Sequence, residues 1–181
     1  ASAGLPAVQL VAGPMMTGSH QGERLGACTD CRRFWAQFRA GTLSKTGVDG
    51  IEDRLAVTAG TCPVMGTAST MACLAETLGI ALPGTAAIPA VHADRLRAAE
   101  ATGELAMRLT ENGITPDRLI TSRSIENTLR VLLALGGSTN AIIHLTAIAG
   151  RLGVGVSLQT LNRLSDTTPV LAGLFLKEFA L

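Results

Sequence analysis

The sequence is poor in aromatic residues, with one Trp, four Phe and no Tyr among its 181 residues. Charge of either sign is also in short supply: 15 Lys and Arg stand against 14 Asp and Glu, which leaves a formal net charge of +1. Proteins that bind nucleic acid rely on a basic surface or on aromatic rings that stack with bases. Since both are scarce here, the composition argues against a nucleic-acid partner.

Long hydrophobic runs and a cysteine framework are missing as well. No apolar run approaches the roughly 18 residues of a membrane span, so we expect no membrane partner. The first 13 residues lack the charged start of a signal peptide. Four cysteines are too few for a disulfide scaffold in a chain of this size. Together these absences predict a protein of the reduced cytoplasm.

What the chain does contain is a high apolar content. Hydrophobic residues make up 47% of it and charged residues 16%, against about 25% charged in an average soluble domain. Its length fits one domain at roughly 150 residues per domain. Such a chain either buries a large core or hides part of its surface against other protein, so apolar helix faces are expected to pack against missing strands or a partner subunit.

Glycine and proline divide the chain into segments with recognisable patterns. An apolar run at 6–13 predicts a buried strand, and 86–90 reads as a second extended stretch. Helices are predicted at 30–39, 51–57, 67–78, 93–112, 125–135, 139–149 and 157–164. This pattern predicts a helix-rich α/β fold in which helices cover a parallel sheet.

Two of these helices carry more specific expectations. The helix at 93–112 should bury Leu96, Ala99, Leu105 and Leu109 on one side. The helix at 139–149 is apolar nearly all round and should itself be buried, with His144 as a core histidine.

Cysteines are the first candidates for chemistry. Cys62 lies on a turn-rich loop just before a helix, and a helix N-terminus favours the thiolate that acts as a metal ligand or nucleophile. The alternative is a buried structural thiol. Cys28 and Cys31 have C-x₂-C spacing, which could serve half a metal site or a redox pair, but no second pair accompanies them. We therefore favour a structural role for those two, and a core position for Cys73.

Several polar residues could contact a substrate. Gly136-Gly137-Ser138-Thr139-Asn140 precedes a helix, where free N–H groups attract an anion, although Ser138 could simply cap that helix. His20 lies on a glycine-rich loop that is either a substrate contact or a solvated turn. His92-Ala-Asp-Arg95 opens the long helix, most simply as a charged first turn. No dinucleotide or phosphate-loop fingerprint is present.

Four motifs carry a family resemblance through their order and spacing: 60–72 (GTCPVMGTASTMA), 76–84 (ETLGIALPG), 92–95 (HADR) and 136–140 (GGSTN). Together they resemble the dihydroxy-acid and phosphogluconate dehydratase family. The segments 22–35 (GERLGACTDCRRFW) and 85–89 (TAAIP) look more like its sugar-acid branch, of the arabinonate type.

The resemblance implies a hydro-lyase that converts a 2,3-dihydroxy sugar acid into a 2-keto-3-deoxy acid. In the family, an iron–sulfur cluster acts as Lewis acid on the departing C3 hydroxyl, Mg²⁺ holds the carboxylate and C2 oxygen, and a serine alkoxide removes the C2 proton. Hydroxide is a poor leaving group and the C2 proton is weakly acidic, so both steps need a cation nearby. A 2Fe–2S cluster is expected, with 4Fe–4S as the alternative.

Few of the family's functional residues have a match in this chain. Cys62 matches the third cluster cysteine. No Cys-Asp-Lys motif is present, and the other cluster cysteines, a modified lysine, the Mg²⁺ carboxylates and the catalytic serine belong to motifs that this sequence lacks. The segment after Leu174 also departs from the family pattern. We therefore expect residues 1–181 to be the middle of an N-terminal α/β domain, inactive and free of a cluster by itself.

His20, Ser138 and Thr139 are the expected substrate contacts, and the parent protein is expected to be a homodimer or tetramer. Three alternatives stay open. The parent could be a branched-chain dihydroxy-acid dehydratase, the chain could be a non-catalytic fragment or binding module, or Cys28 and Cys31 could serve a redox protein.

Overall fold

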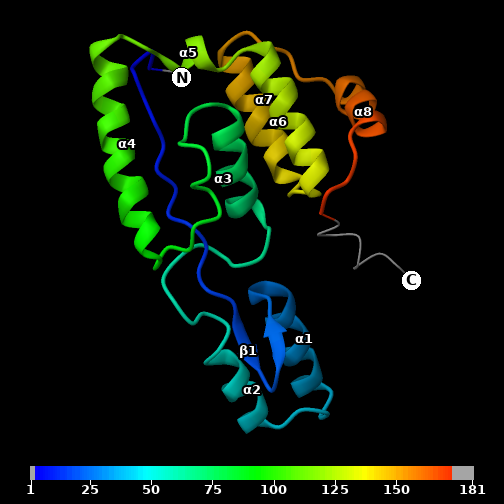
Figure 1. The fold of residues 1–181 in the computed structure, drawn as a ribbon. Coiled ribbons are helices and arrows are strands. Elements are labelled where there is room, and N and C mark those ends of the chain that lie inside the picture. The colour runs from blue at the N-terminus through cyan, green and yellow to red at the C-terminus, as the bar shows by residue number, and fades with distance from the viewer. Residues whose placement is uncertain (1–2, 173–181) are drawn as a thin grey trace.

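The computed structural model describes residues 3–172, which fold into two lobes (Figure 1). One, the hairpin lobe, consists of β1 (Gly18–His20), β2 (Glu23–Leu25), α1 (Ala27–Arg39) and α2 (Lys45–Glu52). The other, the helical lobe, consists of α3 (Thr67–Thr77), α4 (Ala93–Glu111), α5 (Pro116–Leu119), α6 (Ser122–Leu135), α7 (Asn140–Arg151) and α8 (Leu158–Thr167).

The hairpin lobe has a small core. Strands β1 and β2 pair in antiparallel register, with His20 opposite Glu23, around a turn in which Gln21 and Gly22 both take left-handed φ angles. Helices α1 and α2 pack against each other. The buried apolar residues shared by these elements are Leu25, Phe34, Val48 and Ile51.

The helical lobe has the larger core, in which α3 packs against α6 and α7, and α6 also packs against α8. Leu74, Leu129 and Leu145 are almost completely buried where these helices meet. The complete cluster is Leu74, Leu78, Ile120, Ile125, Leu129, Leu132, Ala141, Leu145, Ala149 and Leu164. This packing fixes the start of α3 relative to the start of α7, which matters for the candidate site below.

Most predicted helices are confirmed, with ends shifted by a few residues where capping differs. Helix α6 begins earlier than predicted because Thr121 and Ser124 form a reciprocal capping box. The prediction of a helix at 51–57 is wrong. Helix α2 instead begins after Ser44, whose side chain accepts a hydrogen bond from the Gly47 N–H, and it ends at Glu52.

The predicted strands are not found in residues 3–172. Residues 6–12 are exposed or half-buried and form no strand, and 86–90 forms turns, so the expectation of a buried strand is wrong. The only sheet of the described part is the two-stranded hairpin, and a single parallel bridge joins Pro14 to Thr61. An extended segment needs a paired neighbour to become a strand, and no described segment pairs along 6–13. The helix-rich character is confirmed, while the parallel sheet stays a prediction.

Two helix faces also differ from expectation. Helix α4 turns Arg95, Ala98, Thr102 and Leu109 inward and leaves Leu96 76% exposed. Helix α7 exposes Ile143 and His144, so His144 is not a core histidine. None of the helices within residues 3–172 is long and apolar enough to cross a membrane.

Candidate functional site

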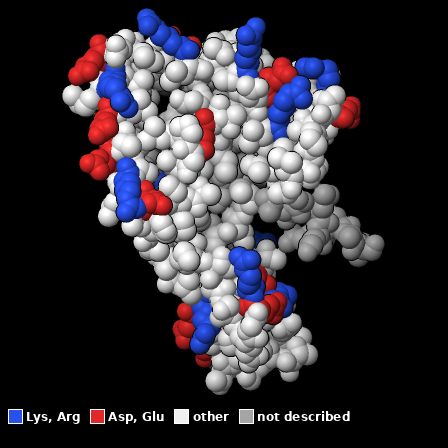
Figure 2. Space-filling model, viewed as in Figure 1, with Lys and Arg blue, Asp and Glu red and all other residues white. Residues whose placement is uncertain are grey.

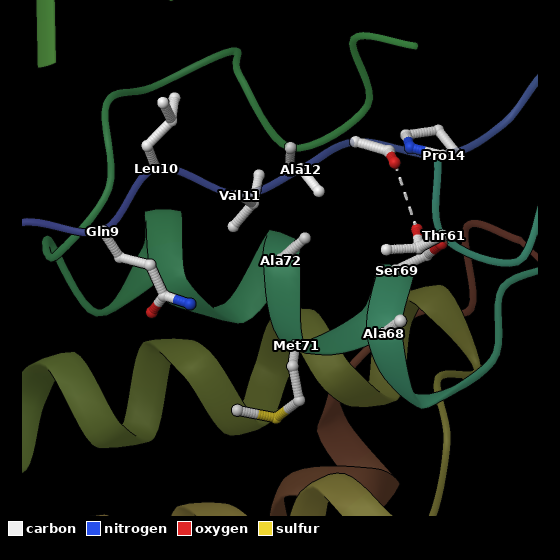
Figure 3. Close-up of a pocket in the computed structure, with 12 residues that line it drawn as sticks. Gln9, Leu10, Val11, Ala12, Pro14, Thr61, Ala68, Ser69, Met71 and Ala72 are labelled. Carbon is white, nitrogen blue, oxygen red and sulfur yellow. Dashed lines mark hydrogen bonds between the residues drawn. The ribbon is translucent and has the colours of Figure 1, made fainter. Parts of the chain in front are cut away.

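The loop that carries Cys62 is anchored to the extended N-terminal segment. The Thr61 N–H donates to the Gly13 carbonyl at 2.9 Å, and the Met15 N–H donates to the Thr61 carbonyl at 2.9 Å. The Thr61 hydroxyl also donates to the Gly13 carbonyl, at 3.3 Å (Figure 3). Gly60 has a φ of +137°, and a Cβ there would overlap the backbone of Met15, so only glycine fits. The backbone on the N-terminal side of Cys62 is therefore tightly defined.

Helix α3 begins five residues after Cys62, and its N-terminus has no side-chain cap. Its N-cap residue, Gly66, provides no side-chain hydrogen bond, so the first-turn N–H groups have no side-chain cap. The Ser69 hydroxyl, in that first turn, donates to the Cys62 carbonyl at 3.5 Å. Cys62 itself is half-buried. The structure thus places the Cys62 backbone beside the N-terminus of α3, which is the positive end of the helix dipole.

The start of α7 meets the start of α3. The Thr67 and Ser138 hydroxyls are 2.9 Å apart, and the Asn140 side-chain amide donates to the Thr67 hydroxyl at 3.4 Å. The Ser138 N–H donates to the hydroxyl of Thr70, which is completely buried, at 3.1 Å. We call Cys62, residues 66–70 and residues 136–140 the α3–α7 corner.

Gly137 makes this close approach possible. A Cβ at this position would come within 2.8 Å of both Leu132 Cδ1 and Thr70 Cγ2. Gly136, just before it, ends α6 in the left-handed conformation with a φ of 58°. The two glycines therefore reverse the chain after α6 and allow the start of α7 to touch α3.

The corner combines two uncapped helix N-termini with several hydroxyl groups. Thr139 is the N-cap residue of α7, but its exposed side chain makes no capping hydrogen bond. Figure 2 shows most charged side chains at the top of the helical lobe and on the hairpin lobe, with a mostly uncharged surface between them. Apart from the Cys62 thiol, the corner has no ionisable side chain. Helix dipoles and hydroxyls are therefore its main polar features, and these favour an anion such as a carboxylate.

The structure brings Cys62, Ser138 and Thr139 into one region but leaves His20 in the hairpin lobe. The His20 ring lies against α2, where a Cβ added to Gly50 would be 3.6 Å from its Cε1 atom. His92 caps α4, and its Nδ1 accepts from the Asp94 N–H at 3.1 Å. That geometry supports the charged first turn expected for this motif. A substrate contact by His20 stays a prediction.

The remaining cysteines lie on helices α1 and α3. Cys28 is exposed and Cys31 half-buried on α1, and all four thiols are free. Cys73 lies on α3, where burial raises the pKa of its thiol and the nearby Glu76 carboxylate acts in the same direction. A raised thiol pKa disfavours the thiolate. Cys73 is only half-buried and lies outside the core cluster, so the expected core position is not confirmed.

Thr67 and Thr70 organise the corner, yet the sequence does not predict them as site residues. Their i,i+3 spacing places both on one face of the helix directly after the Cys62 loop. That spacing does not reveal their partner, because Ser138 is 71 residues further along the chain from Thr67.

A hollow of about 310 Å³ lies between segment 9–14 and α3 (Figure 3). Its lining is mostly small and apolar, with Val11, Ala68 and Ala72 as examples, and no ionisable side chain of the described residues borders it. The hollow therefore offers no ionisable side chain for acid–base chemistry or for binding a metal, and the α3–α7 corner is the better candidate site.

The donor set accommodates one ligand of a metal cluster and no more. Among residues 3–172, no group of three or more His, Cys, Asp and Glu side chains could hold a metal ion. An iron–sulfur cluster needs several thiolates, and Mg²⁺ prefers carboxylate oxygens, which the corner lacks. Cys62 fits the role of a single cluster ligand, and any further ligands would have to come from outside the described residues.

Residues 1–175 match the family model described as dihydroxy-acid/6-phosphogluconate dehydratase N-terminal. Dihydroxy-acid dehydratase from Ruminiclostridium cellulolyticum is 39% identical over 170 residues, and that from Methanospirillum hungatei is 41% identical over 170 residues. The enzyme of the same name from Geobacter metallireducens is 40% identical over 171 residues.

Each comparison covers 94% of this chain but only 31% of the relative. The chain thus spans about a third of the length of the curated relatives that it matches. The motifs that carry the resemblance include Cys62 and 136–140, the two parts of the α3–α7 corner that the fold brings together. By sequence and by the match over nearly its whole length, the chain belongs to the dihydroxy-acid/6-phosphogluconate dehydratase N-terminal family.

Proposed function

We propose that the protein carrying this chain is a hydro-lyase that removes water from a 2,3-dihydroxy carboxylate and yields a 2-keto acid. In this reaction the C2 proton and the C3 hydroxyl leave as water, and the resulting enol tautomerises to the ketone. The observation that carries the proposal is the position of Cys62 beside the uncapped start of α3, in a corner shared with Ser138. Membership of the dehydratase family supports the reaction class.

Cys62 would contribute one thiolate ligand to an iron–sulfur cluster. When bound, such a cluster supplies a Lewis acid that helps a hydroxyl group to leave. The chain's own part is to present the thiol from a loop that is fixed on one side by Gly13 and Met15 and on the other by α3. The remaining thiolates and the Mg²⁺ carboxylates would come from other parts of the protein.

Ser138 and Thr139 would hold the substrate carboxylate. The N–H groups at the two helix starts favour negative charge, and the exposed Thr139 hydroxyl is available to donate a hydrogen bond. Ser138 is only half-buried, and its hydroxyl already contacts Thr67 at 2.9 Å. This contact would orient the Ser138 hydroxyl rather than occupy both of its lone pairs.

The relatives favour a branched-chain dihydroxy acid as the substrate over a sugar acid. The relatives described above are named dihydroxy-acid dehydratases, which supports a small dihydroxy acid such as dihydroxy-isovalerate. A sugar acid is the second candidate, supported by segments 22–35 and 85–89. The first of these spans β2 and most of α1, and the second is the turn whose Thr85 and Ile88 carbonyls accept hydrogen bonds from Arg95.

A homodimer or tetramer is proposed as the assembled form. Leu96 and Met107 on α4 are 76% and 63% exposed, and large exposed apolar residues favour burial against further protein. Sedimentation of the purified protein would give a mass of at least two protomers, whereas a monomer mass would contradict this part of the proposal.

The experiment is a 2-keto acid assay on the natural protein that carries this sequence, purified without oxygen. We expect turnover of dihydroxy-isovalerate, with an aldonate such as arabinonate as the competing substrate. Cys62→Ser should abolish turnover, whereas the matched variant Cys73→Ser should retain it. Absence of activity on both substrates would contradict the proposal and favour a non-catalytic binding module, and preference for the aldonate would favour the sugar-acid branch.

A second variant tests the anion-binding role of the corner. Ser138→Ala removes a hydrogen bond to a charged group, which is worth about 1.5–3 kcal/mol, so KM should rise roughly tenfold or more. Ser165→Ala, on the exposed surface of α8, serves as the control and should leave KM unchanged. Equal KM values for the Ser138 variant and the natural protein would remove Ser138 from the substrate site.

A further inference from the structure

Arg95 is a buried arginine on α4 that hydrogen-bonds only to backbone carbonyls. Arg95 as a whole is only 7% exposed. Nη1 donates to the Val11 carbonyl at 2.9 Å, and Nη2 donates to the Thr85 carbonyl at 2.8 Å and to the Ile88 carbonyl. No carboxylate within residues 3–172 forms an ion pair with it. The guanidinium thus joins α4 to two separate segments of irregular chain.

These two segments close on each other around the guanidinium. The Ala90 N–H donates to the Pro14 carbonyl at 2.9 Å, which ties the 85–90 turn to the N-terminal segment. Gly13 has a φ of +85°, and a Cβ there would overlap the Ile88 carbonyl and crowd Arg95. The backbone at Gly13 therefore lies directly against the guanidinium and the turn that it holds.

The same short stretch carries the Cys62 loop. Gly13 accepts a hydrogen bond from the Thr61 N–H, and Thr61 in turn accepts one from Met15. Residues 11–14 are thus bound by Arg95 at Val11 and by Thr61 at Gly13. The α4 guanidinium is thus connected to the residue immediately before Cys62 by hydrogen bonds at Val11 and Gly13 and by the short backbone between them.

Apolar packing alone does not account for this orientation of α4, although Ala98 and Leu109 are buried on the same face as Arg95. A rotation that buried Leu96 instead of Arg95 would place an aliphatic side chain inside, yet Leu96 is 76% exposed. The observed orientation also leaves Arg95 Nε buried with no hydrogen-bond partner among the described residues. In this orientation the guanidinium is a rigid, planar donor that holds the carbonyls of Val11, Thr85 and Ile88 in fixed relative positions.

We propose that Arg95 is a positioning residue for Cys62. By holding the carbonyls of Val11, Thr85 and Ile88, it fixes residues 11–14 as the template to which Thr61 binds. The thiol that follows Thr61 is thereby kept in one place relative to α3. The claim that Cys62 needs this placement because it is a cluster ligand rests on the proposed function. The placement of Cys62 by Arg95 does not depend on the proposed function.

The experiment measures alkylation of individual cysteines by iodoacetamide, followed by peptide mass spectrometry. The complete protein is first treated with a chelator under reducing conditions, so that the thiols are free. Arg95→Met removes all the donors, Arg95→Lys keeps the charge but not the planar fork, and Arg97→Met, on the exposed face of α4, is the matched control. Cys28 and Cys73 serve as internal references within each sample.

We expect Arg95→Met to raise the Cys62 alkylation rate about tenfold relative to Cys28 and Cys73, the effect of losing roughly one hydrogen bond of local stability. Arg95→Lys should give a smaller increase, and Arg97→Met none. An unchanged Cys62 rate in folded Arg95→Met would overturn the proposal. A parallel rise of Cys62 and Cys73 would do so too, because it would mean general loosening of α3. Should Arg95→Met fail to fold, Arg95→Lys decides by the same criteria.

Iron analysis of the untreated protein separates this inference from the proposed function. A natural protein without iron would overturn the cluster assignment but leave the alkylation result in force. Full iron binding by Arg95→Met, together with an unchanged Cys62 rate, would overturn the positioning role and leave the cluster assignment standing.

Discussion

The two lobes are stabilised by different means. In the helical lobe ten buried apolar residues form one cluster, whereas the corresponding cluster of the hairpin lobe has four. The hairpin lobe relies more on polar contacts at its surface: Arg33 contacts both Asp30 and Glu23, and the Trp35 indole donates to Glu52 at 2.7 Å. Exposed ion pairs contribute little to stability compared with apolar burial. We therefore expect the hairpin lobe to open first.

This difference separates the candidate residues into two groups. Cys62, Ser138 and Thr139 are positioned by α3 and α7, which share the larger core. His20, Cys28 and Cys31 are on elements with the smaller core. A site that must hold its groups in fixed positions is better placed on the more stable elements. We therefore expect the corner to keep its geometry even when the hairpin lobe is disturbed.

The largest expected effect comes from Leu74→Ala. Leu74 is completely buried on α3, and truncation of such a leucine costs about 2–5 kcal/mol. Hydrogen exchange should show faster exchange throughout α3, α6 and α7. Ile51→Ala, in the hairpin core, should instead accelerate exchange in the hairpin lobe alone. Faster exchange in α6 or α7 of the Ile51 variant would contradict the expectation that the two lobes differ in stability and open separately.

Thr70→Val tests the polar contact between α3 and α7. The substitution preserves shape but leaves the buried Ser138 N–H without its acceptor, which should cost about 1–3 kcal/mol in urea denaturation. Thr110→Val is the control, because Thr110 is exposed on α4 and donates only to the Ala106 carbonyl of its own helix. Equal losses for the two variants would mean that the corner contact contributes no more than an ordinary helix contact.

Gly137→Ala tests the close approach of the two helix starts. The added methyl group would press on Leu132 and Thr70, and such overpacking costs about 1–3 kcal/mol. Gly150→Ala, in α7 with open space around it, should be stabilising by up to about 1 kcal/mol. A thermal melt that shows no loss for Gly137→Ala would contradict the tight packing described for the corner.

The smallest effect concerns the titration of Cys73. Burial raises the pKa of this thiol in the folded state, so the folded protein binds the proton more tightly than the unfolded chain does. Stability from the neutral thiol is complete below the ordinary thiol pKa and declines as the pH rises toward the raised value. The pH midpoint of Cys73 alkylation should therefore be higher in the folded protein than in urea. Ile51→Ala should leave this midpoint unchanged, since Cys73 belongs to the helical lobe.

The helices were predictable because their signals are local. The helices predicted at 67–78 and 157–164 can be read from a few neighbouring residues, and the structure confirms both as α3 and α8. The strand predicted at 6–13 is absent, because an apolar run becomes a strand only through pairing with distant residues. In α4 the helical period and the burial of Leu109 were predicted correctly, whereas Leu96 is exposed and Arg95 points inward. Arg95 is held there by the nearby carbonyls of Thr85 and Ile88 and by the distant carbonyl of Val11.

The candidate site was predictable in its parts and not in its arrangement. The loop and helix position of Cys62 and the glycine turn before Ser138 are visible in the sequence. Their proximity depends on Thr67 and Thr70, whose contacts with Ser138 span 71 and 68 residues. No short-range pattern encodes such a contact. The sugar-acid branch was inferred from segments outside the corner, and the relatives compared here support the family without supporting that branch.

The most direct test of the central claim is the iron content of the natural protein, purified without oxygen, in comparison with Cys62→Ser and Cys73→Ser. If Cys62 is a cluster ligand positioned by the α3–α7 corner, Cys62→Ser loses most of the iron and the cluster absorption, while Cys73→Ser keeps both. Equal iron in all three proteins, or no iron in the natural one, would contradict the account.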